Sequence, residues 1–117
     1  MTVLLVDDHH GIRELEKSIF SSLFDTFYES SSGEDAITIY KTYKPDWVLM
    51  DYKMRGISGI DALKKIKEND AGAKVIMVTQ FEDADLKKKA LDSGVIAFVS
   101  KEKLSTIKNI ILTNKEN

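Results

Sequence analysis

Five short runs of apolar residues, each followed by a segment with helical spacing, constrain the fold of this chain more than any other feature. The runs read TVLLV (2–6), TFYES (26–30), DWVLMD (46–51), AKVIMVTQ (73–80) and VIAFVSK (95–101). Short apolar runs that contain β-branched residues are typical of strands buried on both faces of a sheet. Each run is therefore predicted to be a strand.

The segments that follow these runs are predicted to be helices. They cover 9–24, 32–43, 60–69, 83–94 and 102–114. In the first segment, apolar residues recur at the spacing of one helix face: Ile12, Leu15, Ile19, Phe20 and Leu23. Ser32 is the expected N-cap of the second helix, and Gly94 is the expected stop of the fourth.

Five strand–helix units in a row predict an α/β fold. Such units join parallel strands through right-handed crossovers, which cover both faces of the sheet with helices. The expected architecture is a (βα)5 doubly wound parallel five-stranded sheet of the flavodoxin-like type, with strand order 2-1-3-4-5. Residues 1–117 are expected to form one domain, since no linker or internal repeat interrupts the pattern.

Composition excludes several classes of function. The net charge is −2, with 17 basic and 19 acidic residues, which argues against direct nucleic-acid binding by this segment. No apolar run approaches the length of a membrane span, so no membrane association is expected. The chain has no cysteine and begins almost directly in a strand, which fits a cytoplasmic protein.

Charged and hydroxyl side chains stand at the carboxyl ends of four predicted strands, where open α/β sheets bind ligands. They are Asp7 and Asp8, Asp51, Thr79, and Lys101. In the order 2-1-3-4-5 the first and third strands are neighbours, so the three carboxylates would share a pocket. Two carboxylates about 4 Å apart repel by about 4 kcal/mol at an effective dielectric near 20. A Mg²⁺ ion would remove this conflict, because it prefers carboxylate and water oxygens.

A carboxylate beside a metal ion, facing a hydroxyl and an ammonium group, is suited to receive a phosphoryl group. Lys101 and the metal would neutralise the charge of the phosphoryl group, and Thr79 would donate to one of its oxygens. Asp51 would attack as the nucleophile and form an aspartyl phosphate. Each residue also has an ordinary structural explanation: the aspartates as helix or loop caps, Thr79 as a strand residue, Lys101 as a surface lysine.

The chain resembles bacterial response-regulator receiver domains over its whole length. The blocks LLVDD, PDWVLMDYKM, ISGIDALKKIK, VIMVT and GVIAFVSK stand where that family has its motifs. DDHHGIR, and a lysine not followed by proline, are most similar to the NarL/FixJ subfamily of the CheY-like superfamily. The resemblance implies a signalling domain rather than an enzyme, one that catalyses only its own phosphorylation and slow self-dephosphorylation.

The resemblance also assigns roles to residues. Asp51 would be the phosphoacceptor. Asp7, Asp8 and Asp51 would hold Mg²⁺, together with the main-chain carbonyl of Lys53. Thr79 and Lys101 would contact the phosphoryl group, and Thr79 and Phe98 would form the switch that responds to it.

The implied phosphodonor is a sensor histidine kinase or a phosphotransfer protein. The implied output surface, toward a partner or an effector domain, is the face formed by 83–92, 95–99 and 103–113. A homodimer on activation also fits the resemblance. NarL/FixJ-type receivers usually precede a DNA-binding helix-turn-helix, and none is present, so the chain is either a stand-alone receiver or a piece of a longer regulator.

Phe81, two residues past Thr79, is expected to slow self-dephosphorylation, because its side chain has no group that orients a hydrolytic water. We expect Phe81→Glu to lose phosphate faster than the unchanged chain when decay of the phosphorylated form is followed over time. A variant that loses phosphate no faster would contradict this interpretation.

Four other interpretations are open at this point. His9 or His10 could ligate a transition metal, although relatives carry histidine at position 9 without such a role. An aspartate-nucleophile phosphohydrolase would want a second acid two residues past Asp51, where Lys53 stands. A degenerate receiver that signals without phosphate would not need the complete site, and a flavodoxin-like cofactor binder would need a phosphate-binding loop after the first strand.

Overall fold

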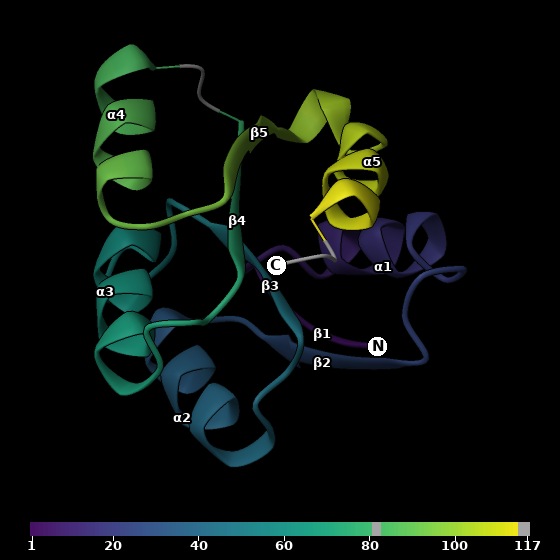
Figure 1. Cartoon of the computed structure of the whole chain (residues 1–117), viewed down its shortest axis with the longest axis horizontal. Coiled ribbons are helices and arrows are strands. Elements are labelled where there is room, and N and C mark those ends of the chain that lie inside the picture. Colours follow the sequence, from purple (N-terminus) through teal and green to yellow (C-terminus); the bar gives the residue numbers. More distant parts are fainter. Residues whose placement is uncertain (81–82, 115–117) are drawn as a thin grey trace.

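The computed structural model, which describes residues 1–80 and 83–114, contains one five-stranded sheet with all strands parallel. The strands are β1 (Thr2–Val6), β2 (Thr26–Ser30), β3 (Trp47–Asp51), β4 (Val75–Thr79) and β5 (Ala97–Ser100). Their order is β2-β1-β3-β4-β5, which confirms the predicted topology (Figure 1). The expected fifth strand, 95–101, is shorter than predicted.

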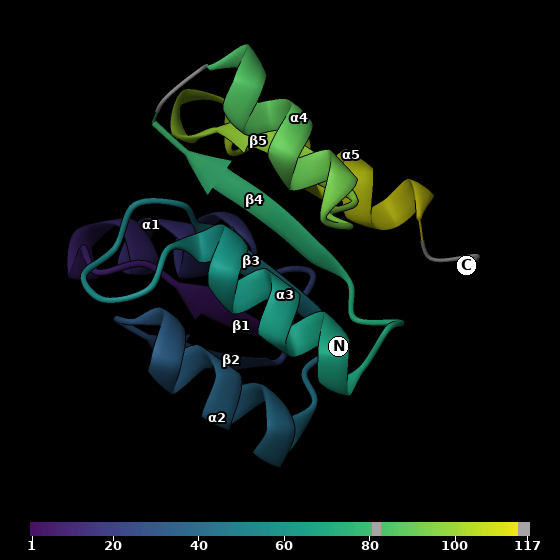
Figure 2. The ribbon, with the colours of Figure 1, turned by 90° about the vertical axis from the view of Figure 1, so that its left-hand side faces the viewer.

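Five α-helices cover the sheet in the described ranges. They are α1 (His10–Ile19), α2 (Gly33–Tyr43), α3 (Gly59–Asn69), α4 (Ala84–Asp92) and α5 (Thr106–Thr113). Helices α1 and α5 lie on one face of the sheet, and α2, α3 and α4 lie on the other (Figures 1 and 2). The predicted doubly wound arrangement is therefore correct.

Each face of the sheet has its own apolar core, because side chains alternate along the strands. In β3, Trp47 and Leu49 pack in the core under α1 and α5, whereas Val48 and Met50 pack in the core under α2, α3 and α4. All five residues of β3 are buried, as are all five of β4. The central strands are thus buried on both faces, as their continuous apolar sequence predicts.

The predicted helix ends are confirmed where a local signal specifies them. Ser32 caps α2 by accepting a hydrogen bond from the Asp35 N–H at 3.1 Å. Gly94 follows α4 with a φ of +105°, and the next N–H, of Val95, bonds to the Ala90 carbonyl at 3.2 Å. This pair of features is a glycine-terminated helix end, in which the left-handed backbone favours glycine.

Two helices are shorter than predicted. The first ends at Ile19 instead of residue 24, and Phe24 packs in the core from the turn that follows. The last begins at Thr106 instead of residue 102, because Lys101–Lys103 forms a 3-10 turn whose Glu102 N–H bonds to Ser100 Oγ at 3.2 Å. Phe81, whose role in dephosphorylation stays a prediction, lies outside the described residues.

Leu15 departs from the predicted apolar spacing of α1. It is 47% exposed, whereas the next residue, Glu16, is only 2% exposed. Across 1–80 and 83–114, no helix is long and apolar enough to cross a bilayer.

Candidate functional site

The parallel sheet brings the predicted site residues to one edge. Asp7 directly follows β1, Asp51 ends β3, and these two strands pair in register with Val6 opposite Met50. Carboxylate oxygens of Asp7, Asp8 and Asp51 and a ring nitrogen of His9 all lie within 4.8 Å of one another. The structure thus brings the three carboxylates together in one cluster, as expected.

Lys101 supplies the cation of this pocket. Its ammonium group is 2.8 Å from Asp7 Oδ2 and 3.4 Å from Asp51 Oδ2, and its side chain is nearly buried. Burial alone would lower the pKa of this ammonium, but the hydrogen bond with Asp7 and the charge of Asp51 hold the pKa above its ordinary value. Lys101 is therefore charged, and its ammonium group is fixed between the carboxylates of Asp7 and Asp51. A surface lysine would not be fixed in this way.

Asp51 lies at the centre of the cluster and is 4% exposed. Burial raises the pKa of its carboxyl to about 6, the Asp7 carboxylate adds to the rise, and Lys101 opposes it. A shift of this kind at the end of a central strand is typical of a functional carboxylate.

A cavity of about 240 Å³ opens above Asp51. It is lined by Asp8, His9, Asp51, Lys53, Gln80 and Lys101. Thr79 and Asp7 do not line this cavity: Thr79 is fully buried at the end of β4, opposite Ser100 in β5, and Asp7 lies beneath, paired with Lys101. A group as small as a phosphoryl group fits this volume above Asp51.

Helix capping does not account for the two adjacent aspartates. The N-cap position of α1 is His9, whose side chain makes no capping hydrogen bond. Asp7 Oδ1 instead accepts a hydrogen bond from the His9 N–H at 2.9 Å. The acids therefore belong to the pocket rather than to the helix end.

The loop after β3 is held in place by hydrogen bonds of its backbone N–H groups and by close packing. The Gly59 N–H donates to the Tyr52 carbonyl at 2.8 Å, and the Ile57 N–H donates to Glu34 Oε2 at 3.3 Å. Gly59 lies directly against the Asp51 carbonyl, where a side chain would not fit. The loop that carries Lys53 is thus anchored on α2 and α3 beside the site.

The residues of the pocket fit a hard divalent cation. Asp8 Oδ1 is buried and makes no hydrogen bond among the described residues, although Nδ1 of His9 lies 3.0 Å away. Lys101 pairs with Asp7 and Asp51 but with no atom of Asp8. Carboxylates held this close repel one another, and a cation between them removes that conflict. Such an ion could be held by the carboxylates of Asp8 and Asp51 and by neighbouring oxygen atoms.

Sequence reasoning missed two members of this region. Gln80 lines the cavity from the end of β4. Glu16 lies in α1, with its side chain buried and its pKa raised to about 8 by burial, then by Asp7, against the opposing charge of Lys101. Glu16 follows Ile12 by four residues and precedes Phe20 by four, so its place on the inner face of α1 was readable from the helical period.

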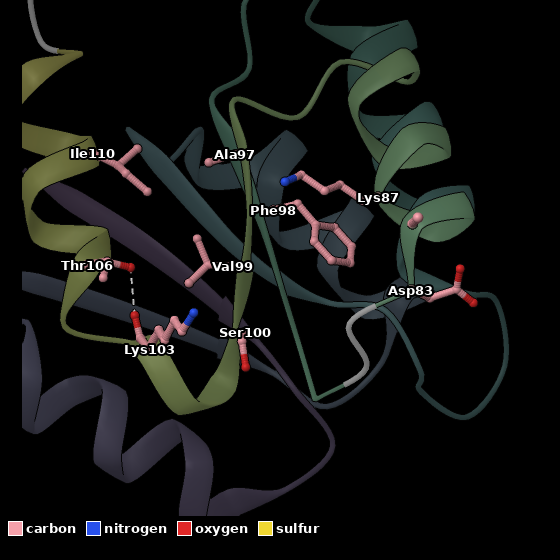
Figure 3. Close-up of a pocket in the computed structure, with 10 residues that line it drawn as sticks. Asp83, Lys87, Ala97, Phe98, Val99, Ser100, Lys103, Thr106 and Ile110 are labelled. Carbon is pink, nitrogen blue, oxygen red and sulfur yellow. Dashed lines mark hydrogen bonds between the residues drawn. The ribbon is translucent and has the colours of Figure 1, made fainter.

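A second cavity, of about 500 Å³, is lined in part by Phe98, the second residue of the predicted switch. Figure 3 shows Phe98 of β5 between that strand and α4, beside Lys87, with Val99 and Ile110 on the side of α5. Phe98 is half-buried and packs against the core under α2, α3 and α4. The cavity spans α4, β5 and α5, the elements of the predicted output surface.

Proteins of known function that are similar to this chain are signalling proteins. The chain is 40% identical over 99 residues to the chemotaxis protein CheY of Halobacterium salinarum, covering 85% of this chain and 82% of that protein. It is 37% identical over 103 residues to the response regulator UvrY of Escherichia coli, covering 86% of this chain and 47% of UvrY. The chain thus spans about half the length of UvrY.

Solved structures with the same fold include receiver domains. The CheY of Borrelia burgdorferi, crystallised in a complex described as CheX-CheY-BeF3-Mg+2, has a TM-score of 0.90 at 29% identity, over 97% of this chain and 87% of that one. A DNA-binding response regulator of the LuxR family from Staphylococcus aureus has a TM-score of 0.86 at 25% identity, over 96% of each chain.

The family model described as the response regulator receiver domain matches residues 3–112, which is nearly the whole chain. Phosphorylation and Mg²⁺ binding at an acidic pocket are characteristic of that family, and an acidic cluster stands at the corresponding edge of this sheet. The chain therefore belongs to the response regulator receiver domains, the signalling domains of two-component systems.

Proposed function

We propose that this receiver domain accepts a phosphoryl group on Asp51 from a sensor histidine kinase or a phosphotransfer protein. The observation that supports this most directly is the position of the Asp51 carboxylate. It ends a central strand, faces a cavity of about 240 Å³, and lies 3.4 Å from the Lys101 ammonium. No second acid follows two residues later to serve a leaving group, since Lys53 stands there, which disfavours a phosphohydrolase.

In the proposed reaction, a carboxylate oxygen of Asp51 attacks the phosphorus of a phosphohistidine. The new O–P bond forms as the N–P bond breaks, and the electron pair of that bond returns to the imidazole of the donor, which takes up a proton. Lys101 is positioned to neutralise charge on the phosphoryl oxygens, because its ammonium group already lies between Asp7 and Asp51. Thr79 is proposed to donate to a phosphoryl oxygen.

Mg²⁺ is the proposed cofactor, held by Asp7, Asp8, Asp51 and the main-chain carbonyl of Lys53. When bound, it neutralises the negative charge that develops on the transferred group. The carboxylate oxygens of Asp8, Asp7 and Asp51 lie within 4.8 Å of one another, which supports the role of Asp8 as a ligand.

The proposed switch couples the phosphoryl group to the face formed by α4, β5 and α5. A phosphoryl group adds about −1.5 to −2 charges, which draws Thr79 toward it. Phe98 then fills the space that Thr79 leaves, and the surface around the cavity of about 500 Å³ changes shape. This face would bind an output partner or effector domain, or a second copy on activation. The proposed location is the cytoplasm, where phosphoryl donors formed from ATP are available.

Incubation with Mg²⁺ and acetyl phosphate, followed by intact-mass measurement, tests the proposal. We expect one phosphoryl group on the unchanged chain, none on Asp51→Asn, and none without Mg²⁺. Asp92→Asn is the matched control, since Asp92 is exposed and pairs only with Lys88 in the described residues. It should be phosphorylated like the unchanged chain.

Two results would contradict the proposal. A phosphoryl gain that persists in Asp51→Asn would place the acceptor elsewhere. No gain at all, together with failure to bind beryllofluoride, would indicate a receiver that signals without phosphate.

A further inference from the structure

We propose that Arg13 is a positioning residue for the acidic pocket: its guanidinium group binds the main-chain carbonyl of Asp7 and thereby fixes the direction in which Asp8 enters the pocket. The inference rests on the proposed function, because it assumes that Asp8 holds a divalent ion. It goes beyond that function by giving a role to the last residue of the segment DDHHGIR (7–13) and to Glu29 of β2, neither of which lines the cavity above the phosphoacceptor.

The guanidinium group of Arg13 has a neighbour at each of its three nitrogen atoms. Nη1 donates to the main-chain carbonyl of Asp7, Nε donates to Glu29 Oε1 at 3.0 Å, and Nη2 faces His10 Nδ1 at 3.4 Å. The side chain is only 14% exposed, so water competes little for these contacts. Because the guanidinium is planar and rigid, contacts at three points leave it one orientation, and the carbonyl that it binds is held with it.

The carbonyl that Arg13 binds belongs to the peptide group that joins Asp7 to Asp8. This group is planar, so fixing its carbonyl also fixes the direction of the chain as it leaves β1 and the position of the Asp8 Cα. Strand β2 holds the same stretch of backbone from its other side, because the Asp7 N–H donates to the Ser30 carbonyl at 3.0 Å. The end of β2 thus supports the acid pair twice, through this backbone bond and through Glu29, which holds Arg13.

Glu29 is shared between Arg13 and a second cation, Lys17. The Lys17 ammonium group lies 3.0 Å from Glu29 Oε2 and 2.6 Å from Glu14 Oε2. Burial acts to raise the pKa of Glu29, but the hydrogen bonds from Lys17 and Arg13 hold that pKa below its ordinary value, so the carboxylate stays charged. Lys17 therefore carries the same charge on the same partner as Arg13, but in the described ranges only Arg13 of these two also binds the Asp7 carbonyl.

Charge and position predict opposite effects of these two residues on Mg²⁺ binding. Removal of a cation beside an acidic pocket reduces the repulsion of Mg²⁺, so loss of charge alone would tighten binding in both Arg13→Met and Lys17→Met. Loss of a contact that orients a ligand weakens metal binding, typically about tenfold or more. The sign of the change in affinity therefore separates a positioning role from an effect of charge.

Titration with Mg²⁺, followed in nitrogen–proton NMR spectra, tests the proposal. We expect Arg13→Met to bind Mg²⁺ about tenfold more weakly than the unchanged chain. Lys17→Met is the matched control and should bind Mg²⁺ as tightly as the unchanged chain, or slightly more tightly. Arg13→Lys keeps the charge but has one nitrogen in place of three, so it should also bind Mg²⁺ more weakly.

The spectra of the metal-free chain give a second readout. A hydrogen bond to a peptide carbonyl shifts the resonance of the nitrogen in the same peptide group, which is here the amide nitrogen of Asp8. This resonance should move in Arg13→Met and stay in place in Lys17→Met. Urea unfolding establishes that each variant folds, and Arg13→Lys carries the comparison where Arg13→Met does not fold.

The other outcomes separate this inference from the proposed function. Mg²⁺ affinity that is unchanged or higher in both Arg13 variants would overturn the role of Arg13 and leave the phosphoacceptor site intact. An equal loss of affinity in Lys17→Met would also overturn it, because a general loosening of α1 against β2 would then be the cause. Absence of Mg²⁺ binding by the unchanged chain would overturn both, and the acetyl phosphate experiment would fail with it.

Discussion

We expect the substitution Glu16→Met to raise the free energy of unfolding by about 3–5 kcal/mol at pH 8, and by only about 1–2 kcal/mol at pH 5. Glu16 is 2% exposed, and its Oε1 has no hydrogen-bond partner in the ranges described. Methionine has a similar unbranched shape and no charge to bury, so it should occupy the same space in α1. The gain therefore depends on how far Glu16 is ionised.

The sign of the pH dependence follows from the pKa of Glu16. Burial raises that pKa from 4.5 to about 8 in the folded chain, and the Asp7 carboxylate adds to the rise. Between pH 4.5 and pH 8, Glu16 holds a proton in the folded state that it has released in the unfolded state. Stability therefore falls as pH rises from about 4.5 to 8, and the contribution of Glu16 to this loss is on the order of 4 kcal/mol.

Urea unfolding at pH 5, 6, 7 and 8, in the absence of divalent cations, measures the effect. Asp51, whose pKa is raised to about 6, adds a loss of stability with the same sign at lower pH. This loss occurs in both chains, so the difference between them isolates Glu16. Glu14→Met is the control, because Glu14 is exposed and pairs with Lys17 on the same helix. It should change stability by less than about 1 kcal/mol at every pH. A difference for Glu16→Met that is equal at pH 5 and pH 8 would contradict the argument.

The sheet was predictable because short apolar runs alternate five times with segments of helical spacing. Val48, Leu49 and Met50 are apolar in succession, as in a strand covered on both faces, and all three are buried. The expected strand order then placed Asp7 beside Asp51. The site was predictable for the same reason, since its side chains follow the carboxyl ends of these strands.

The predicted apolar side of α1 is correct for Phe20, which is in the core, and for Ile19 and Leu23, which pack against it, but not for Leu15, which is exposed. Leu15 looks like a core residue and Glu16 like a surface residue, yet the helix turns 100° per residue, which places Glu16 on the same side as the buried Phe20, four residues later. The charge of Lys101 in the acidic pocket explains part of the placement of Glu16. Glu16 lies near enough to Lys101 for that ammonium to lower its pKa, an interaction that no local pattern reveals.

Close approaches of the backbone were also beyond sequence reasoning. GISG (56–59) indicates a turn, but it does not say which glycine lacks room for a side chain. In the structure, a Cβ on Gly59 would overlap the Asp51 carbonyl oxygen and lie 2.9 Å from the Tyr52 Cα. Both neighbours are backbone atoms, so neither can turn away as a side chain would.

Gly59→Ala is expected to lower the free energy of unfolding by about 3 kcal/mol and to slow phosphorylation of Asp51 by acetyl phosphate. Relief of the clash requires the Asp51–Tyr52 backbone or the start of α3 to move. Either shift strains the hydrogen bond from the Gly59 N–H to the Tyr52 carbonyl, which is 2.8 Å long, and displaces the Asp51 carboxylate relative to Lys101. Urea unfolding measures the first effect, and the initial rate of mass gain measures the second.

Gly11→Ala is the matched control for Gly59→Ala, because Gly11 also lies in the first turn of a helix. A Cβ there meets no atom within 4 Å. Alanine is favoured over glycine in a helix by up to about 1 kcal/mol, so Gly11→Ala should stabilise the chain while Gly59→Ala destabilises it. If both variants stabilised the chain, the helix preference of alanine would outweigh the contact, and the loop after β3 would have to yield at little cost. Opposite signs would show that the Asp51 backbone is held rigidly against α3, which is what a fixed phosphoacceptor requires.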